Sequence, residues 1–142
     1  MSTNYHRHPP LAAEVVKLTV YLILTGILFV AFGLFALIDP VRAVAIPYAI
    51  GAAAPDARNY LRAGAGGVTT AAGLVMLLAT YYQALILVGL MIAVIFFTGL
   101  VSGRVVSRIL DGPWGSVVVF AFWGEIIGLV FGVYWVFEFS LA

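Results

Sequence analysis

The stretch GLVSGRVVSRILDGPWGSVVVFAFWGE, residues 99–125, is the most informative part of this chain. It contains two apolar segments joined by Asp-Gly-Pro at residues 111–113, where glycine favours the end of a helix and proline cannot extend one. Both apolar segments also carry charge, from Arg104 and Arg108 in the first and from Glu125 in the second. The pattern predicts two adjacent membrane helices that place charged groups inside lipid, where such groups are costly and usually functional.

The composition excludes a soluble domain and several kinds of chemistry. Of the 142 residues, 64% are hydrophobic and 9% are charged, whereas soluble domains carry roughly 25% charged residues. The net charge of +1 and the scattered basic residues exclude a nucleic-acid-binding surface. Because the chain has no cysteine, disulfides, thiolate nucleophiles and cysteine-ligated metals are excluded. The composition therefore indicates an integral membrane protein.

Runs without charge set the number of membrane crossings. Ala63–Gly103 has no charged residue for 41 positions, which is about 61 Å of helix and about twice the hydrocarbon thickness. The run must hold two spans, with a turn at residues 80–83, where tyrosines favour the headgroup level. We predict a single domain with an all-α fold, an integral membrane four-helix bundle. Its parts are a polar tail over residues 1–14, spans over about 15–38, 62–80, 84–110 and 115–139, and a surface loop over 39–61.

The segments outside the spans suggest the topology. The tail contains His6 and His8, and we expect it to be solvated rather than metal-binding. The uncharged run Leu18–Ile38 has 21 residues, longer than the roughly 7–15 of a cleaved signal, and predicts a retained anchor. In the loop we expect a short interfacial helix near Val41–Ile46 and a helix cap at Asp56. The loops carry more arginine than the termini, which predicts an inner-membrane protein with both termini outside the cytoplasm.

Glycines are spaced as close helix packing requires. In lipid, helices associate through close backbone approach along small residues, because no hydrophobic force draws them together. The glycines expected to form these contacts are Gly66, Gly67, Gly73, Gly99, Gly103, Gly124, Gly128 and Gly132. The sequence thus predicts glycine-rich helix contacts of the GxxxG kind.

Five charged residues are expected to share a polar, ligand-binding pocket. Glu125 lies about 15 Å inside the fourth span, near the bilayer midplane, and Arg104 lies about 9 Å inside the third. The offset is about the length of an arginine side chain, so the two groups can meet. The predicted pocket residues are Arg62, Arg104, Arg108, Asp111 and Glu125, with Asp111 paired to Arg108. A purely structural role is the alternative, strongest for Arg108 and Asp111 at a helix end.

Catalytic motifs are missing from the chain. The sequence has no GxSxG, Walker loop, HExxH or dinucleotide-binding GxGxxG. Its only histidines lie in the tail, so a histidine-ligated haem inside the bundle is excluded. We therefore predict no metal and no cofactor, and the sequence favours a protein that is not an enzyme.

Two blocks of sequence resemble an uncharacterised family of small bacterial membrane proteins, domain of unknown function 4345. The first is RAGAGG at residues 62–67, running on to Gly73, and the second is SGRVVSRILDGP at residues 102–113, followed by an acidic residue at Glu125. The resemblance covers roughly residues 56–136, and the second block is the more specific. It implies four membrane helices with a shared polar cluster, and it brings no established activity.

Three functions are consistent with this pattern. The first, which we favour, is binding of a lipid headgroup, a quinone or another small amphiphile in the pocket, because arginine suits phosphate and carboxylate groups. The second is a non-catalytic accessory subunit that packs through its glycines against a membrane-protein partner or a copy of itself. The third is a proton-coupled carrier or membrane enzyme in which Glu125 titrates, as midplane carboxylates do in proton relays.

Overall fold

The computed structural model describes residues 12–141 of the chain. These residues are helical apart from turns and one longer loop, and they contain no strand. Four helical runs are long and apolar enough to cross a membrane, namely Glu14–Ile38, Pro55–Ala79, Gln83–Leu110 and Ser116–Ser140. The predicted all-α membrane bundle is confirmed.

The second crossing is a composite helix. In chain order the elements are α1 (Ala12–Ile38), η1 (Val41–Ala45), α2 (Pro55–Leu61), η2 (Arg62–Val68), α3 (Thr69–Ala79), η3 (Gln83–Leu85), α4 (Ile86–Leu110) and α5 (Ser116–Leu141). The segment η2 is a π-helix that joins α2 to α3 without a break. The crossing begins at Pro55, since proline at a first helical position loses no hydrogen bond. The predicted span over 62–80 placed Arg62 at the start of a helix. In the structure Arg62 lies inside the helical run that begins at Pro55.

The loop between α1 and α2 differs from the sequence prediction at its end. The predicted helix cap at Asp56 is wrong, because Ala54 occupies the capping position and makes no side-chain hydrogen bond there. Instead, Arg58 holds the loop by donating to the carbonyls of Ala52 and Ala53, at 3.2 and 2.6 Å. A short helix does form near the predicted place, as the π-helix η1, and its buried side chains pack near Leu61.

Both helical hairpins turn where the sequence punctuates them. A turn at residues 80–82 and the 3-10 segment η3 join α3 to α4, with Tyr81 and Tyr82 exposed. At the second hairpin α4 ends at Leu110, and Gly112 adopts a φ of +96°, which glycine tolerates and other residues avoid. These local signals fix how many crossings the chain makes.

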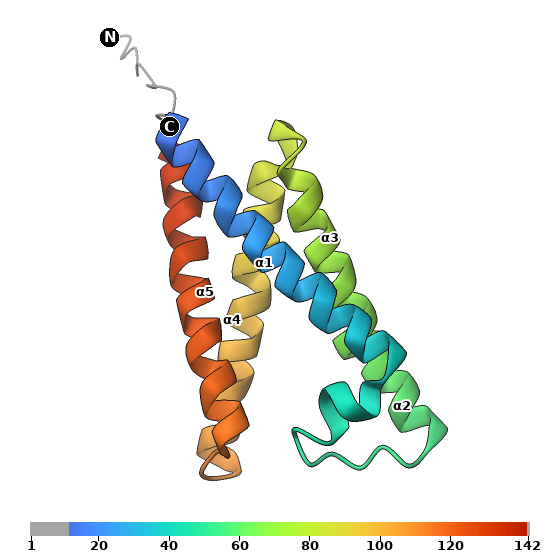
Figure 1. Cartoon of the computed structure of the whole chain (residues 1–142). Helices are drawn as coiled ribbons and strands as arrows, with labels where there is room; N and C mark the ends of the chain where they lie inside the picture. Colours follow the sequence, from blue (N-terminus) through green and yellow to red (C-terminus); the bar gives the residue numbers. More distant parts are fainter. Residues whose placement is uncertain (1–11, 142) are drawn as a thin grey trace, which may run out of the picture.

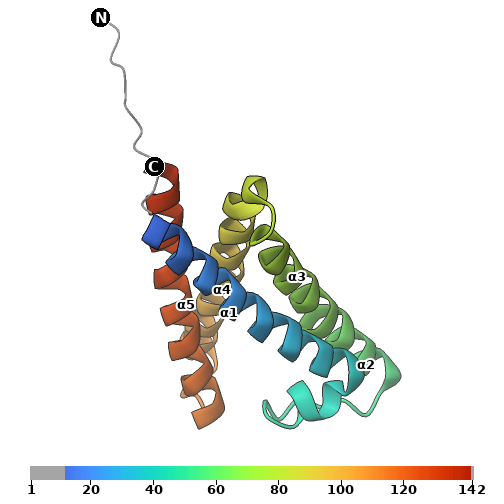
Figure 2. The same ribbon diagram turned by 45° about the horizontal axis from the view of Figure 1, so that its top comes forward.

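The crossings are arranged as two helix pairs that diverge. Helix α1 packs along η2 and α3, α4 packs along α5, and α3 also contacts α4. The start of α1 and the end of α5 lie together at one end of the molecule, and the two helices separate towards the other end (Figures 1 and 2). A link between them is the Tyr21 hydroxyl, which donates to the carbonyl of Gly128 at 2.9 Å.

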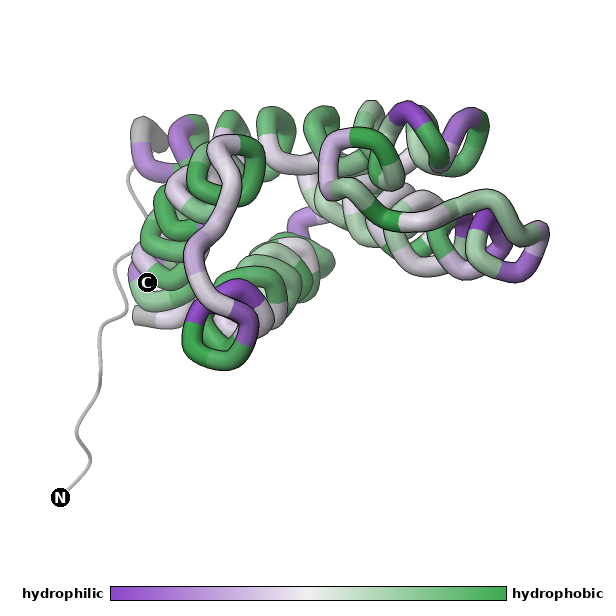
Figure 3. The backbone as a smooth tube through the Cα atoms, turned by 90° about the horizontal axis from the view of Figure 1, so that it is seen from below, coloured by the Kyte–Doolittle hydropathy of each residue, from purple (hydrophilic) through white to green (hydrophobic). Residues whose placement is uncertain are grey.

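The core lies where α1, α3 and α4 meet. Leu22, Met76 and Leu90 are fully buried there, one from each helix. Hydrophobic residues also cover much of the outer helix walls, and hydrophilic ones gather at the helix ends and loops (Figure 3). This distribution suits a surface in contact with lipid.

The two ends of the bundle hold different parts of the chain. Helix α1 begins and helix α5 ends at one end of the bundle. The 39–54 loop and the α4–α5 turn lie at the other end (Figure 1). Most of the predicted polar tail, with His6 and His8, lies outside the described residues. Which end faces the cytoplasm, and in which membrane, stays a prediction.

Close glycine contacts join α1 to the second crossing. A methyl group on Gly73 would lie 2.7 Å from the carbonyl oxygen of Gly26, and one on Gly66 would lie 2.9 Å from the backbone nitrogen of Leu37. A methyl group on Gly33 would likewise lie 2.6 Å from the backbone nitrogen of Thr70. Gly26 and Gly33 belong to α1 and were missing from the sequence prediction. Backbone approaches this close are what association in lipid requires.

The other predicted packing glycines divide into two groups. Gly128 and Gly132 meet side chains, those of Phe97 and of Tyr21 and Val94, when a methyl group is placed on them. Around Gly99, Gly103 and Gly124 nothing in the described chain lies within 4 Å, and Gly67 meets only a carbonyl of its own helix. Within residues 12–141, no neighbouring helix packs against these four glycines, so the predicted packing contact is not seen there. Spacing of four residues places glycines on one face, but it does not put a neighbour opposite them.

Candidate functional site

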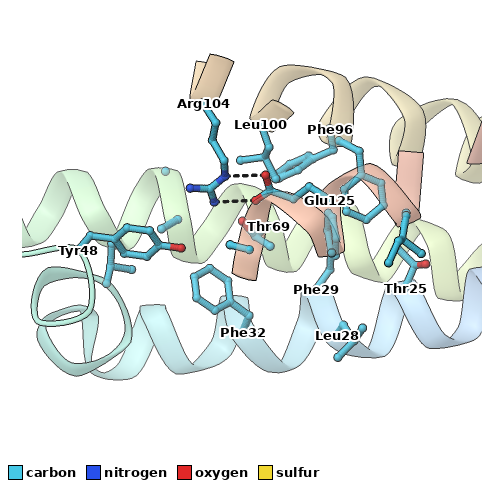
Figure 4. Close-up of a pocket in the computed structure, with 18 of the residues that line it drawn as sticks. Thr25, Leu28, Phe29, Phe32, Tyr48, Thr69, Phe96, Leu100, Arg104 and Glu125 are labelled. Atoms are coloured by element: carbon cyan, nitrogen blue, oxygen red, sulfur yellow. Dashed lines mark hydrogen bonds and ion pairs between the residues drawn. The ribbon is translucent and has the colours of Figure 1, made fainter. Parts of the chain in front are cut away.

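The centre of the candidate site is an ion pair between the last two crossings. Nε and Nη2 of Arg104 on α4 each donate to a carboxylate oxygen of Glu125 on α5, both at 2.6 Å (Figure 4). Glu125 is only 8% exposed, although it lies far from either end of its helix. The contact predicted from the sequence is confirmed.

The fold places this pair through the α4–α5 hairpin. The tight turn after Leu110 makes the two helices antiparallel neighbours, so residues 21 apart in sequence lie side by side. Two parallel N–H···O bonds satisfy both oxygens of the carboxylate, which is the strongest geometry available to this pair. Burying two charges is still costly, and apolar packing of similar volume is often as stable or more so. Stability alone is therefore a weak reason for this pair to be there.

A cavity of about 940 Å³ lies beside the ion pair. Phenylalanine rings from α1 and α4, including Phe29 and Phe96, form much of its wall, and Thr25 and Thr69 add hydroxyl groups. Among the described residues that line it, Arg104 and Glu125 are the charged ones. The cavity is therefore mostly apolar, and its charged groups are gathered at the Arg104–Glu125 pair (Figure 4).

The cavity reaches the lipid-facing flank between α1 and α5. Three apolar residues of its lining are more than half exposed: Leu28 on α1 at 68%, and Ile127 and Phe131 on α5 at 57% and 52%. This is the flank on which α1 and α5 make few contacts. A hydrophobic molecule in the bilayer therefore meets an apolar opening here.

The loop after α1 closes part of the cavity near the ion pair. Val44 of η1 is buried and Tyr48 is half-buried, and both line the cavity. The Tyr48 ring lies beneath the guanidinium of Arg104, with 5.9 Å from Cζ to the ring centroid. This distance permits a cation–π attraction, and it ties the loop to α4.

The other three predicted pocket residues lie elsewhere. Nε of Arg62 donates to the carbonyl of Leu37 at 3.0 Å, so Arg62 satisfies a carbonyl left free at the end of α1. Arg108 and Asp111 are exposed and do not line the cavity, and no ion pair joins them within residues 12–141. Arg108 is one turn, about 6 Å, nearer the helix end than Arg104, and that step takes it out of the cavity. Of the five predicted pocket residues, Arg104 and Glu125 line the cavity and the other three do not, and ligand binding by any of them stays a prediction.

Sequence reasoning missed most of the residues that line the cavity. Tyr48 stands in an irregular loop after Pro47, where no periodic pattern predicts a tertiary contact. Tyr21 and Thr25 did carry a signal, because polar residues four apart in an apolar span share a face that should turn inward. The phenylalanines carry none, since rings are as common on lipid-facing surfaces.

The fold and the site define a small integral membrane protein with a buried arginine–glutamate pair beside an apolar cavity. The chain belongs to the family described as domain of unknown function (DUF4345), whose model matches residues 17–136. The match extends beyond the resemblance found in residues 56–136, because it includes nearly all of α1. No curated protein and no solved structure gives a significant match.

Proposed function

We propose that this protein binds a small membrane-dissolved amphiphile in the cavity beside Arg104 and Glu125. The single observation that carries the proposal is the ion pair standing in the wall of an apolar cavity of about 940 Å³. Small-molecule sites are typically cavities of about 300–1,000 Å³ with apolar walls and a few converging polar groups. This cavity has that size and that distribution of polar groups.

Packing considerations support an occupant. The cavity opens on the flank between α1 and α5, so it is not a closed void of the interior, and a molecule from the bilayer can fill it. Most of the wall is apolar around Phe29, Phe96 and Phe97, and polar groups stand at few points of it, so a molecule with an apolar body suits the cavity better than water does. The exposed apolar lining between α1 and α5 supports entry from the bilayer rather than from water.

The polar end of the occupant would lie at the ion pair. Arg104 and Glu125 are the charged groups of the lining, and Tyr48 and Thr69 bring hydroxyl groups to the same part of the cavity (Figure 4). Apolar walls bury the body of an amphiphile, and the polar groups fix its orientation. In this proposal the protein acts by holding the molecule.

Filling the cavity is the direct test. Gly124 lines the cavity and has nothing within 4 Å of its missing side chain, so Gly124→Leu places four carbons there without a backbone clash. Gly99→Leu is the matched control, because Gly99 is equally free of neighbours and does not line the cavity. We expect native mass spectrometry to show a retained lipid-class molecule on the wild type and on Gly99→Leu, and none on Gly124→Leu. An empty wild type, or retention of the same molecule by Gly124→Leu, would contradict the proposal.

A second candidate function has one observation in its favour. Gly99 and Gly103 lie one turn apart on α4, and nothing in the described chain covers them. Such a pair suits close packing by a helix of a larger membrane complex, as the accessory-subunit hypothesis requires. Its test is co-purification of a fixed partner from native membranes, lost in Gly103→Leu. The proton-carrier hypothesis has less support, since Arg104 holds both oxygens of Glu125 and the lining brings no second acid.

A further inference from the structure

We infer that the polar end of the bound amphiphile is uncharged and bears oxygen, as a carbonyl or hydroxyl group does. The inference rests on the proposed function and names the class of ligand that the site selects. It also removes phosphate- and carboxylate-bearing headgroups from the range of amphiphiles expected from the sequence. The reason is that the cavity lining holds one arginine among residues 12–141, whereas the sequence predicted three.

The charge of the cavity lining adds up to zero. Arg104 brings a positive charge and Glu125 a negative one, and the lining holds no other charged side chain among the described residues. The remaining arginines of the loops have other places. Arg42 pairs with Asp39 at 3.4 Å, Arg58 and Arg62 donate to backbone carbonyls, and Arg108 is exposed and outside the lining.

An anionic head would therefore lack a free cation. A phosphate close enough to be attracted by Arg104 would also be repelled by the Glu125 carboxylate, which is hydrogen-bonded to the same guanidinium. The repulsion from Glu125 cancels part of the attraction to Arg104, and the new charge must still give up its water. The pair therefore offers an anion little net binding energy.

The hydrogen-bonding groups at the pair suit neutral oxygen. A guanidinium has five N–H groups, and Arg104 gives two of them to Glu125. Three N–H groups thus remain as donors for a carbonyl, ether or hydroxyl oxygen. The carboxylate oxygens of Glu125 each keep a further lone pair, which can accept from a hydroxyl group. An uncharged head can use both partners without disturbing the pair.

Two probes that share one oleoyl chain test the inference. Monooleoylglycerol carries an uncharged hydroxyl- and ester-bearing head, and oleoyl lysophosphatidate adds a phosphate to the same skeleton. Each is titrated into purified wild type in detergent, with occupancy read by native mass spectrometry. We expect the neutral probe to bind about tenfold tighter or better, because a like charge set against Glu125 opposes the anionic one. Equal affinity, or tighter binding of the lysophosphatidate, would overturn the inference.

Glu125→Gln sharpens the test by leaving Arg104 without a counter-charge. The order of the two probes should then reverse, so that the lysophosphatidate binds the variant more tightly. An unchanged order would overturn the inference. If the variant does not fold, the wild-type comparison decides alone.

Gly124→Leu separates the two proposals. If it weakens both probes while the wild type shows no preference for the neutral head, the cavity binds amphiphiles and only the inference about the head fails. If neither probe binds the wild type at all, the proposed function fails, and the inference fails with it.

Discussion

Helix α1 has two sides that are built in opposite ways. Towards the second crossing it packs backbone against backbone, with Gly26 and Gly33 facing Gly73 and Thr70. On the other side, α1 separates from α5 beyond the Tyr21–Gly128 hydrogen bond, and the cavity lies between the two helices. Both sides are apolar, and glycines lie along both. The contrast shows that glycine allows close approach, but the crossing geometry decides whether the approach takes place.

The same contrast appears between two arginines of α4. Arg104 is largely buried and bonded twice to Glu125, whereas Arg108, one turn further on, is exposed and outside the cavity. Four residues along a helix keep two side chains on nearly one face. One turn along the helix therefore separates a group inside the site from an exposed group outside it.

The largest effect is expected from breaking the ion pair on the open side. Arg104→Met leaves the Glu125 carboxylate buried without its partner, and breaking one half of a buried pair typically costs about 3–5 kcal/mol. The double variant Arg104→Met/Glu125→Leu should recover most of that loss, since it leaves no uncompensated charge. Equilibrium unfolding in mixed detergent micelles measures both. A single variant as stable as the wild type would mean that the pair contributes nothing to the fold.

A smaller loss is expected on the closed side. A methyl group on Gly73 meets backbone atoms of Gly26 and Val30 at 2.7 and 2.8 Å, so Gly73→Ala must push α1 away, at a cost of about 1–3 kcal/mol. Gly99→Ala is the control, because Gly99 has open space around it. It should be neutral or stabilising by up to about 1 kcal/mol, since alanine is the better helix former. If Gly73→Ala and Gly99→Ala unfold at the same denaturant concentration, the close packing of α1 against Gly73 does not stabilise the fold as expected.

A third effect tests the link between α1 and α5. Tyr21→Phe removes the hydroxyl that donates to Gly128 and should cost about 0.5–1.5 kcal/mol, the usual net value of one hydrogen bond. Tyr81→Phe serves as control, since Tyr81 is 84% exposed in the α3–α4 turn. The measurement is the same unfolding titration. Equal stability of Tyr21→Phe and the wild type would show that the open flank needs no such link.

The smallest effect is expected at the end of α4. Arg108→Ala and Asp111→Ala change exposed side chains outside the cavity and should alter stability by no more than about 0.5 kcal/mol. Binding of monooleoylglycerol should match the wild type in both. A loss comparable to that of Arg104→Met in either variant would restore the five-residue pocket expected from the sequence.

Features that are local along the chain could be predicted from the residues without coordinates. Uninterrupted apolar runs gave the number of crossings, because a helix must be about 30 Å long to span the hydrocarbon. Residues 80–83 and 111–113 marked the hairpins through their own turn chemistry. The Arg104–Glu125 pair was also within reach, since a tight turn makes α4 and α5 neighbours and two buried opposite charges need each other.

Which helix faces meet one another could be learned from the tertiary structure and not from the sequence. Helices that are apolar all round carry no stripe that tells which face turns inward, so the rotation of each helix could not be predicted. That rotation and the crossing angles buried Gly26 and Gly73 against each other, left Gly99 and Gly103 open, and put Arg62 on the end of α1. They also made the cavity, because a gap between helix pairs arises from their divergence and not from any one segment.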